Sequence, residues 1–170
     1  MKIILIGYMG SGKSTIGKSL ANKLNLPFVD LDDTIEREIG VSISDFFETF
    51  GELKFRRLER QVLHKIITEK EQMILSTGGG TPCYGDNFML MKSSNAKVFY
   101  LKASIKTLAA RLIDEKNKRP LIRSIGKQNL PEFIGKHLFE RNNFYSQADQ
   151  IVEIDEKSVA EVTERITALL

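Results

Sequence analysis

The stretch that decides the fold is Gly7-Tyr8-Met9-Gly10-Ser11-Gly12-Lys13-Ser14, near the start of the chain. It matches G-x-x-x-x-G-K-[ST] at every fixed position, and its glycines let consecutive backbone N–H groups point at phosphate oxygens. The apolar run 2–6 before it is typical of a buried strand, and Ile16, Leu20 and Leu24 after it recur at helical spacing. A strand, a glycine-rich turn and a helix in this order predict a site for the phosphates of a nucleoside triphosphate.

The last two residues of this loop carry most of its chemistry. The ammonium group of Lys13 is expected to reach the β- and γ-phosphates, and the Ser14 hydroxyl is expected to ligate Mg²⁺ that bridges them. GTPase switches, ATPase motors and small-molecule kinases all use such a loop. Asn117-Lys118-Arg119-Pro120 begins like the guanine-binding motif but has proline where aspartate is required, and 170 residues leave little room for a motor. A small-molecule kinase is therefore favoured.

Length and composition are those of one ordinary globular domain. The chain has 170 residues, 42% hydrophobic and 28% charged, with a net charge of +3 and no basic block, so nucleic acid is not expected as a partner. Cys83 is the lone cysteine, which excludes an internal disulfide and favours the reducing cytoplasm. No apolar run approaches the roughly 20 residues that span a membrane. A cytoplasmic monomer is expected, in which Cys83, His64 and His137 have no catalytic role.

Strands and helices alternate along the rest of the chain. Further strands are expected at 28–30, 73–75, 98–101 and 151–154, and helices at 32–40, 55–66, 105–112, 134–145 and 159–169. This alternation predicts an α/β fold with a parallel sheet and helices on both faces. Ligands of such sheets bind beyond the carboxyl ends of the strands. The polar stretch at about 114–127, with Pro120 and Gly126, is expected to form a mobile lid.

Two aspartates follow the second expected strand. In an extended segment, Asp30 and Asp32 would point to the same side. One carboxylate could hold the water shell of the metal, and the other could accept a proton from a hydroxyl nucleophile. Capping of a helix is the alternative, which is favoured for Asp33. Asp30 and Asp32 are interpreted as functional because the phosphate loop is expected one strand away.

The helix that follows Gly51 holds a candidate anion-binding arginine. Arg56 could bind a carboxylate with both arms of its guanidinium group. The alternative is a solvated helix face on which Arg57 pairs with Glu52 and Glu59, and on this run alone that alternative is favoured. Gly78-Gly79-Gly80 follows the third expected strand and could expose backbone N–H groups to a ligand.

Three further arginines are candidates for contact with an anion. Arg141 falls on the apolar stripe of its helix, where a charge is unfavourable unless it meets an anion. Arg119 and Arg123 lie in the expected lid. An arginine that a closing loop delivers can stabilise the transition state of phosphoryl transfer, and the pattern leaves open whether Arg119, Arg123 or neither of them does so.

Together these motifs resemble those of the shikimate kinase family over nearly the whole chain. The markers are Gly-x-Met-Gly-Ser-Gly-Lys-Ser-Thr at 7–15, Asp-x-Asp at 30–32, Gly-Glu-x-x-Phe-Arg-x-x-Glu at 51–59, Gly-Gly-Gly at 78–80, Arg-Pro-Leu at 119–121 and Arg-x-x-x-Tyr at 141–145. The resemblance implies a nucleoside-monophosphate-kinase-like P-loop fold with three layers and strand order 2-3-1-4-5. It implies transfer of the ATP γ-phosphate to the 3-hydroxyl of shikimate in aromatic amino-acid synthesis. A gluconate kinase and a non-catalytic nucleotide-binding module are the alternatives.

The resemblance also implies roles for individual residues. ATP would be bound by Gly10, Ser11, Gly12, Lys13, Ser14, Thr15, Arg111 and Arg119, and shikimate by Asp32, Arg56, Gly78, Gly79, Gly80 and Arg141. Mg²⁺ would be held by Ser14 and, through water, by Asp30. Lys13, Asp32 and Arg119 would be catalytic. Residues at about 31–61 would form a shikimate-binding part of the single domain.

Overall fold

One parallel sheet organises the chain in the computed structural model, which describes residues 1–114, 122 and 125–170. Its strands are β1 (Lys2–Ile6), β2 (Phe28–Asp30), β3 (Met73–Ser76), β4 (Ala96–Lys102) and β5 (Gln150–Glu153). They lie in the order β2-β3-β1-β4-β5, and every neighbouring pair is parallel. The predicted fold class and strand order are confirmed.

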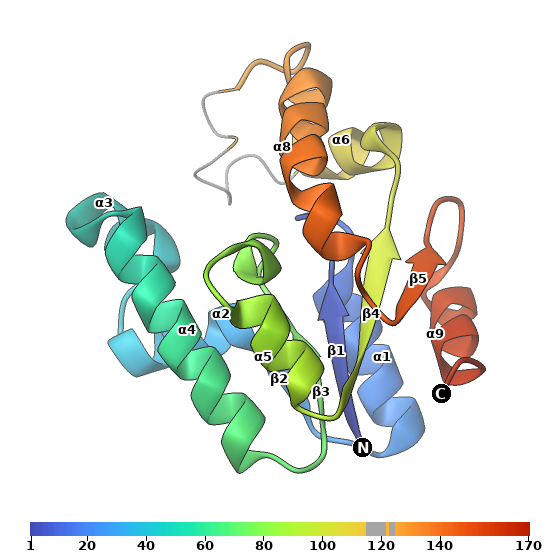
Figure 1. The fold of residues 1–170 in the computed structure, drawn as a ribbon. Coiled ribbons are helices and arrows are strands. Elements are labelled where there is room, and N and C mark those ends of the chain that lie inside the picture. Colours follow the sequence, from blue (N-terminus) through green and yellow to red (C-terminus); the bar gives the residue numbers. More distant parts are fainter. Residues whose placement is uncertain (115–121, 123–124) are drawn as a thin grey trace.

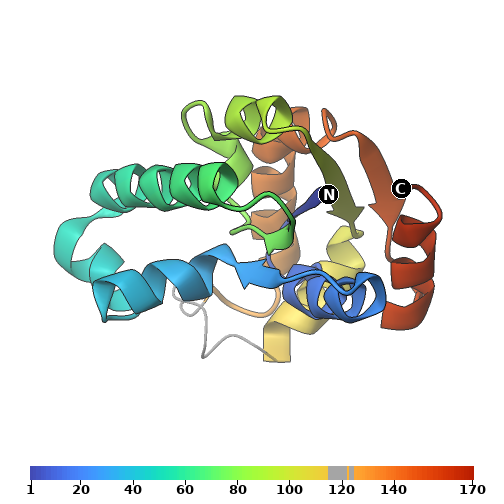
Figure 2. The same ribbon diagram turned by 90° about the horizontal axis from the view of Figure 1, so that it is seen from below.

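Helices cover both faces of this sheet. They are α1 (Lys13–Leu24), α2 (Leu31–Ile39), α3 (Ile43–Phe50), α4 (Glu52–Glu69), α5 (Asn87–Ser93), α6 (Ile105–Asp114), α8 (Leu130–Tyr145) and α9 (Val159–Thr167), with a 3₁₀ turn at Thr81–Cys83. Figures 1 and 2 show α1 and α9 on one face and α4, α5 and α8 on the other. The result is the predicted three-layer arrangement.

The central strand is apolar throughout because both of its faces are covered. Ile3, Ile4, Leu5 and Ile6 in β1 have no exposed surface, and the same holds for Ile74 in β3. Continuous β-branched runs of this kind are typical of strands buried on both faces. Since β1, β2 and β3 are parallel neighbours, their carboxyl ends open at one edge of the sheet. The phosphate loop, Asp30 and the glycine turn at 78–80 therefore meet there.

Two short helices were not anticipated from the sequence. One is α5, and the other is α3, which begins after Ser42, whose hydroxyl accepts the Asp45 N–H at 3.0 Å. The apolar residues of α3 contact a neighbouring helix instead of the sheet, since the Phe47 and Phe55 rings lie 4.5 Å apart. Figure 1 shows α3 and the start of α4 projecting away from the sheet. The range 31–61 corresponds to α2, α3 and the first half of α4.

Candidate active site

A cleft of about 650 Å³ lies at the carboxyl ends of the strands. It is lined by Met9, Gly10, Gly12, Lys13, Ser14, Thr15, Ile16, Asp30, Asp32, Ser76, Thr77, Gly78, Gly79, Arg111, Ile154, Lys157, Ser158, Val159 and Val162. These residues come from the phosphate loop and the start of α1, from the ends of β2 and β3 and the segments after them, from the segment after β5, and, for Arg111, from α6. The cleft thus joins all three motifs that the sequence placed at strand ends.

The phosphate loop has the geometry of an anion cradle. Gly12 immediately precedes α1 with a φ of 83°, a left-handed conformation that glycine adopts without a steric penalty. The Lys13 ammonium group donates to the carbonyl oxygens of Gly7 at 2.8 Å and Tyr8 at 3.0 Å. These bonds hold the lysine across its own loop, next to the positive N-terminal end of α1. The loop and its lysine therefore fit the phosphates of a nucleotide.

Ser14 and Asp30 form the corner of the cleft that suits a magnesium ion. The Ser14 hydroxyl donates to Asp30 Oδ2 at 2.6 Å and lies 3.3 Å from the Ser76 hydroxyl. These oxygen donors are of the type that Mg²⁺ prefers. No group of three or more His, Cys, Asp or Glu side chains within the described part of the chain could hold a metal. A few protein oxygens, completed by water and substrate phosphates, are typical of magnesium in kinases.

Asp30 is also the N-terminal cap of α2. Its Oδ1 accepts the backbone N–H of Asp32 at 3.1 Å and that of Asp33 at 3.5 Å, while its Oδ2 meets Ser14. Capping and metal binding do not exclude each other, because the two oxygens of Asp30 have different partners. The extended segment expected around Asp32 is wrong, because α2 begins at Leu31. Asp32 lies in the first helical turn and still lines the cleft.

Asp32 has the environment of a general base. Burial, reinforced by the neighbouring carboxylates of Asp30 and Glu59, raises the pKa of Asp32 to about 6, while Lys13 opposes this shift. A carboxylate with a pKa close to the working pH accepts a proton more readily than an ordinary aspartate. A Cβ on Gly78 would lie 3.0 Å from Asp32 Oδ1, so the first glycine of the turn leaves room for this carboxylate.

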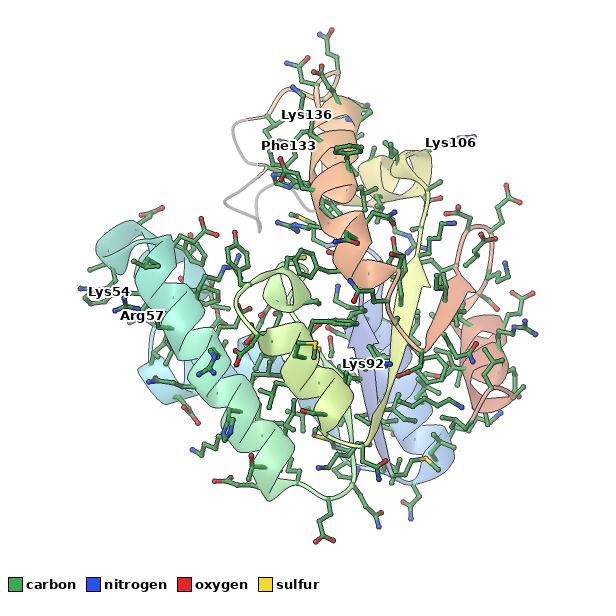
Figure 3. The ribbon with its side chains drawn as sticks, in the orientation of Figure 1. Lys54, Arg57, Lys92, Lys106, Phe133 and Lys136 are labelled. Atoms are coloured by element: carbon green, nitrogen blue, oxygen red, sulfur yellow. The ribbon has the colours of Figure 1, made fainter. Side chains whose placement is uncertain are left out.

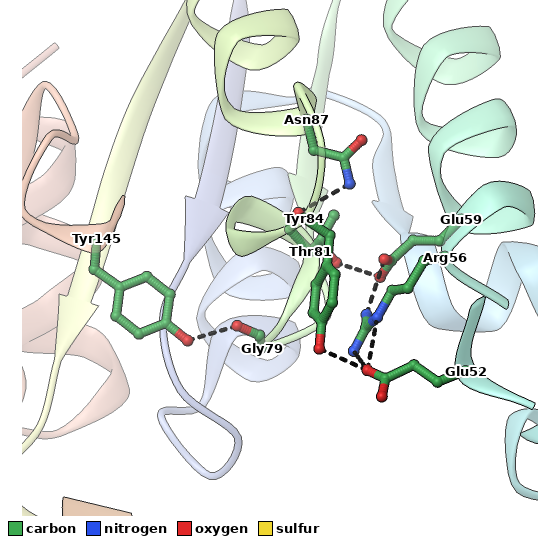
Figure 4. A network of polar contacts seen from close by, with 8 residues as sticks. All are labelled: Glu52, Arg56, Glu59, Gly79, Thr81, Tyr84, Asn87 and Tyr145. Atoms are coloured by element: carbon green, nitrogen blue, oxygen red, sulfur yellow. Dashed lines mark hydrogen bonds and ion pairs between the residues drawn. The ribbon is translucent and has the colours of Figure 1, made fainter. Parts of the chain in front are cut away.

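Arg56 faces inward, and the solvated helix face considered for it is wrong. The Arg56 side chain is 15% exposed, and its NH1 donates to the buried carboxylate of Glu59 at 2.9 Å. Its guanidinium group also lies 3.9 Å from the ring centre of Tyr84 and bonds to Glu52 at 3.3 Å (Figure 4). The next residue, Arg57, is exposed and points away from the fold in Figure 3.

Arg141 approaches the same region from α8. Its guanidinium carbon lies 5.4 Å from the ring centre of Tyr8, and a Cβ on Gly79 would lie 3.6 Å from its NH1. Among the described residues, no carboxylate forms an ion pair with Arg141. Four residues further along α8, the Tyr145 hydroxyl donates to the Gly79 carbonyl at 2.5 Å (Figure 4). One helix therefore supplies the arginine and also holds the glycine turn.

Arg56 and Arg141 lie beyond the cleft, on the far side of the glycine turn. A Cβ added at Gly80 would lie 2.8 Å from Arg56 NH2, and a Cβ added at Gly79 would lie 3.6 Å from Arg141 NH1. The pKa of the Glu52 carboxyl is lowered first by a hydrogen bond from Tyr84 and further by the positive charges of Arg56 and Arg141. Both arginines are therefore close enough to influence this one carboxylate. Two guanidinium groups that lie beside the backbone of the glycine turn suit a small carboxylate.

Comparison with known proteins identifies the family. The shikimate kinase family model matches residues 9–170. Shikimate kinases of Flavobacterium psychrophilum and Flavobacterium johnsoniae are 44% and 43% identical over 169 residues, which cover 99% of this chain and 98% of each relative. The chain belongs to the shikimate kinase family. It is an ATP-dependent kinase that phosphorylates shikimate in aromatic amino-acid biosynthesis.

Solved structures agree with this assignment. The shikimate kinase of Bacteroides thetaiotaomicron is similar with a TM-score of 0.93 at 38% identity, covering 99% of this chain and 97% of that one. The Acinetobacter baumannii shikimate kinase, solved in complex with shikimate, has a TM-score of 0.91 at 32% identity, with 99% and 91% covered. A gluconokinase of Sinorhizobium meliloti has a TM-score of 0.59 at 15% identity, covering 98% and 89%, which shows a shared fold alone.

The remaining site residues expected from the sequence fall into two groups. Arg111 lies beside the phosphate loop, where its NH1 donates to the Gly10 carbonyl at 3.1 Å, and it lines the cleft. Arg119 and Arg123 lie outside the described residues, as does most of the lid at about 114–127. Their roles stay predictions.

The sequence left the end of the cleft near β5 and α9 without an assigned residue. Ile154, Lys157, Ser158, Val159 and Val162 line it, and their mixed apolar and polar surface suits a nucleotide base. A usable signal was present in the sequence. Ser158 and Glu161 form a reciprocal cap at the start of α9, which marks a helix beginning at the sheet edge where ligands bind.

The residues expected to lack a catalytic role have unremarkable environments. Burial raises the pKa of the Cys83 thiol to about 11, so this cysteine is not a thiolate at neutral pH. His64 is exposed, and His137 Nδ1 lies 3.0 Å from the Tyr8 hydroxyl.

Across residues 1–114, 122 and 125–170, no helix is both long and apolar enough to cross a membrane.

Proposed function

We propose that this chain transfers the γ-phosphoryl group of ATP to the 3-hydroxyl of shikimate, with Mg²⁺ as cofactor. One arrangement carries the proposal. The glycine turn separates the phosphate loop from the two arginines and is close to both, since a Cβ on Gly79 would lie 3.1 Å from the Met9 nitrogen. Asp32 lies on the cleft side of this turn. An acid bound by the arginines would thus present its hydroxyls to Asp32 and to the γ-phosphate.

The nucleotide would lie along the cleft. The loop at 10–15 would bind its phosphates, and Arg111 would lie beside them. Ser14 and Asp30 fit Mg²⁺, which would neutralise charge on the β- and γ-phosphates when bound. The segment from Ile154 to Val162 would contact the base. Lys13 would donate to the phosphate oxygens on which negative charge develops during transfer.

Shikimate would be bound through its carboxylate by Arg56 and Arg141. Its hydroxyls would face Asp32 and the backbone of residues 78–80. Asp32 would accept the proton of the 3-hydroxyl as that oxygen attacks phosphorus, and its raised pKa suits this task. Arg119 is proposed, on its sequence motif, to stabilise the phosphoryl group during transfer. The monomeric state and the cytoplasmic location stay predictions.

The direct test is a coupled assay of ADP release with ATP, Mg²⁺ and either shikimate, gluconate or no acceptor. ADP release should depend on shikimate, and gluconate should give no more than the background without acceptor. Release with gluconate alone would support a different acid kinase. Release that no acceptor stimulates would support a nucleotide-binding module without acceptor chemistry.

Arg56→Lys tests the acceptor end of the site. Lysine keeps the charge but loses the planar fork that matches a carboxylate. The KM for shikimate should rise about tenfold, equivalent to about 1.4 kcal/mol, while the KM for ATP stays unchanged. Arg57→Lys is the matched control, because Arg57 is the exposed neighbour on the same helix. Equal losses for both substrates would mean that Arg56 is structural.

A further inference from the structure

We infer that Thr81 is a positioning residue for shikimate binding, acting through Glu59 on Arg56. This inference rests on the proposed function, in which Arg56 binds the substrate carboxylate. Thr81 begins the 3₁₀ turn directly after the three glycines, has no exposed surface and does not line the cleft. Its hydroxyl donates to Glu59 Oε1 at 2.6 Å (Figure 4).

The carboxylate of Glu59 is held between two donors. Thr81 occupies Oε1 at 2.6 Å, and Arg56 NH1 occupies Oε2 at 2.9 Å. Both distances are in the range of strong hydrogen bonds to a charged group. Glu59 is 1% exposed, so water cannot replace a donor that is lost. With both oxygens bonded, the plane of the carboxylate is fixed, and this plane sets the direction in which Arg56 presents its guanidinium group.

The other contacts of Arg56 are looser. Glu52 is 52% exposed, and its Oε1 lies 3.3 Å from both Nε and NH2 of Arg56, longer than a well-formed charged hydrogen bond. Tyr84 supplies the face of its ring, which permits the guanidinium group to slide. The bond to Glu59 is therefore the short and buried one, and the orientation of Arg56 depends on it.

Thr81 is itself fixed from two sides. The amide group of Asn87, on α5, donates to the Thr81 carbonyl at 2.9 Å, and the Thr81 N–H donates to the Gly78 carbonyl at 3.2 Å. Asn87 is 1% exposed. A Cβ on Gly78 would come within 2.9 Å of the Thr81 hydroxyl, so the hydroxyl packs against the glycine turn. A buried chain of contacts thus runs from α5 through Thr81 and Glu59 to Arg56.

The test compares Thr81→Val with Thr81→Ser. Valine keeps the shape of threonine and removes the hydroxyl, whereas serine keeps the hydroxyl. In the valine variant, the KM for shikimate should rise about tenfold, in line with the loss of a hydrogen bond to a charged group. The KM for ATP should stay within about twofold of the wild type, because the phosphate loop is untouched. The serine variant should have a KM for shikimate close to that of the wild type.

Two measurements separate positioning from loss of folding. Kinetics are measured at a temperature at which circular dichroism shows the valine variant folded. Thr163→Val is the matched control, since it removes another buried threonine hydroxyl, from α9, and it should leave the KM for shikimate unchanged. An unchanged KM in Thr81→Val, equal rises for both substrates, or no recovery in Thr81→Ser would each overturn the inference. A wild type that ignores shikimate would instead overturn the proposed function.

Discussion

Substitution of Gly80 by alanine tests the placement of Arg56 by adding a single methyl group. The backbone of Gly80 has a φ of −87° and a ψ of −15°, a region that alanine adopts without strain. Any effect must therefore come from the methyl group and not from the backbone. That group would lie 2.8 Å from Arg56 NH2 and 3.2 Å from NH1.

The size of the displacement follows from these distances. An ordinary van der Waals contact is about 3.5 Å, so the guanidinium group must move by about 0.7 Å or more. It cannot move freely, because it is bonded to the buried carboxylate of Glu59 at 2.9 Å. A misplacement of about 1 Å in a group that positions substrate can lower the rate about a hundredfold. We expect kcat/KM for shikimate to fall about tenfold to a hundredfold.

The assay is steady-state kinetics with each substrate varied in turn. The KM for ATP should stay unchanged in Gly80→Ala. Gly135→Ala is the control, because a Cβ there would meet Ile105 at an ordinary 3.4 Å. That control should keep wild-type kinetics and gain about 0.5–1 kcal/mol in stability, since Gly135 is within a helix. Wild-type kcat/KM for shikimate in Gly80→Ala would refute the placement of the substrate carboxylate at Arg56.

Four further predictions concern the phosphate loop and the two aspartates. Lys13→Ala should lower kcat on the order of a thousandfold with an unchanged circular dichroism spectrum, and near-normal turnover would contradict its role. In a Mg²⁺ titration at saturating substrates, Asp30→Asn should recover part of its activity, whereas Asp32→Asn should stay about 10²–10⁴-fold slower; the opposite result would reverse their roles. Because the pKa of Asp32 is raised to about 6, kcat/KM should fall about tenfold for each pH unit below 6. Because the pKa of Asp32 is higher in the folded chain than in the unfolded one, the ionised carboxylate lowers the free energy of unfolding above pH 6 and has no such effect below about pH 4. Asp32→Asn should therefore raise the free energy of unfolding at pH 8 by about 1–3 kcal/mol. A variant that is less stable than the wild type in a denaturant titration would contradict this.

The fold was predictable because its main signals are local. The phosphate loop fixes a strand before it and a helix after it, and the predicted bounds of β2 at residues 28–30 agree with the structure. Long apolar stripes, such as that of α4, predict their helices clearly. The helices α3 and α5 were missed because they are short, with eight and seven residues, and too short for a periodic pattern to stand out.

The site was predictable only in part, because its support comes from tertiary contacts. The charge of Glu59 favours a solvated helix face, yet Glu59 lies four residues from the buried Leu63, on the apolar face of α4, and is itself buried between Arg56 and Thr81. Nothing in the local pattern indicates that a turn 22 residues later supplies its second donor. The double role of Asp30 was hidden for a similar reason, since capping and contact with Ser14 use different oxygens of one carboxylate.

The central claim is that two arginines, Asp32 and the phosphate loop act on one bound acid. A crystal structure of this protein with shikimate and ADP tests it most directly. The shikimate carboxylate should lie between the guanidinium groups of Arg56 and Arg141, with the 3-hydroxyl within hydrogen-bond distance of Asp32 and facing the phosphates. A carboxylate bound away from both arginines, or a ring turned so that the 3-hydroxyl points away from Asp32, would contradict the account.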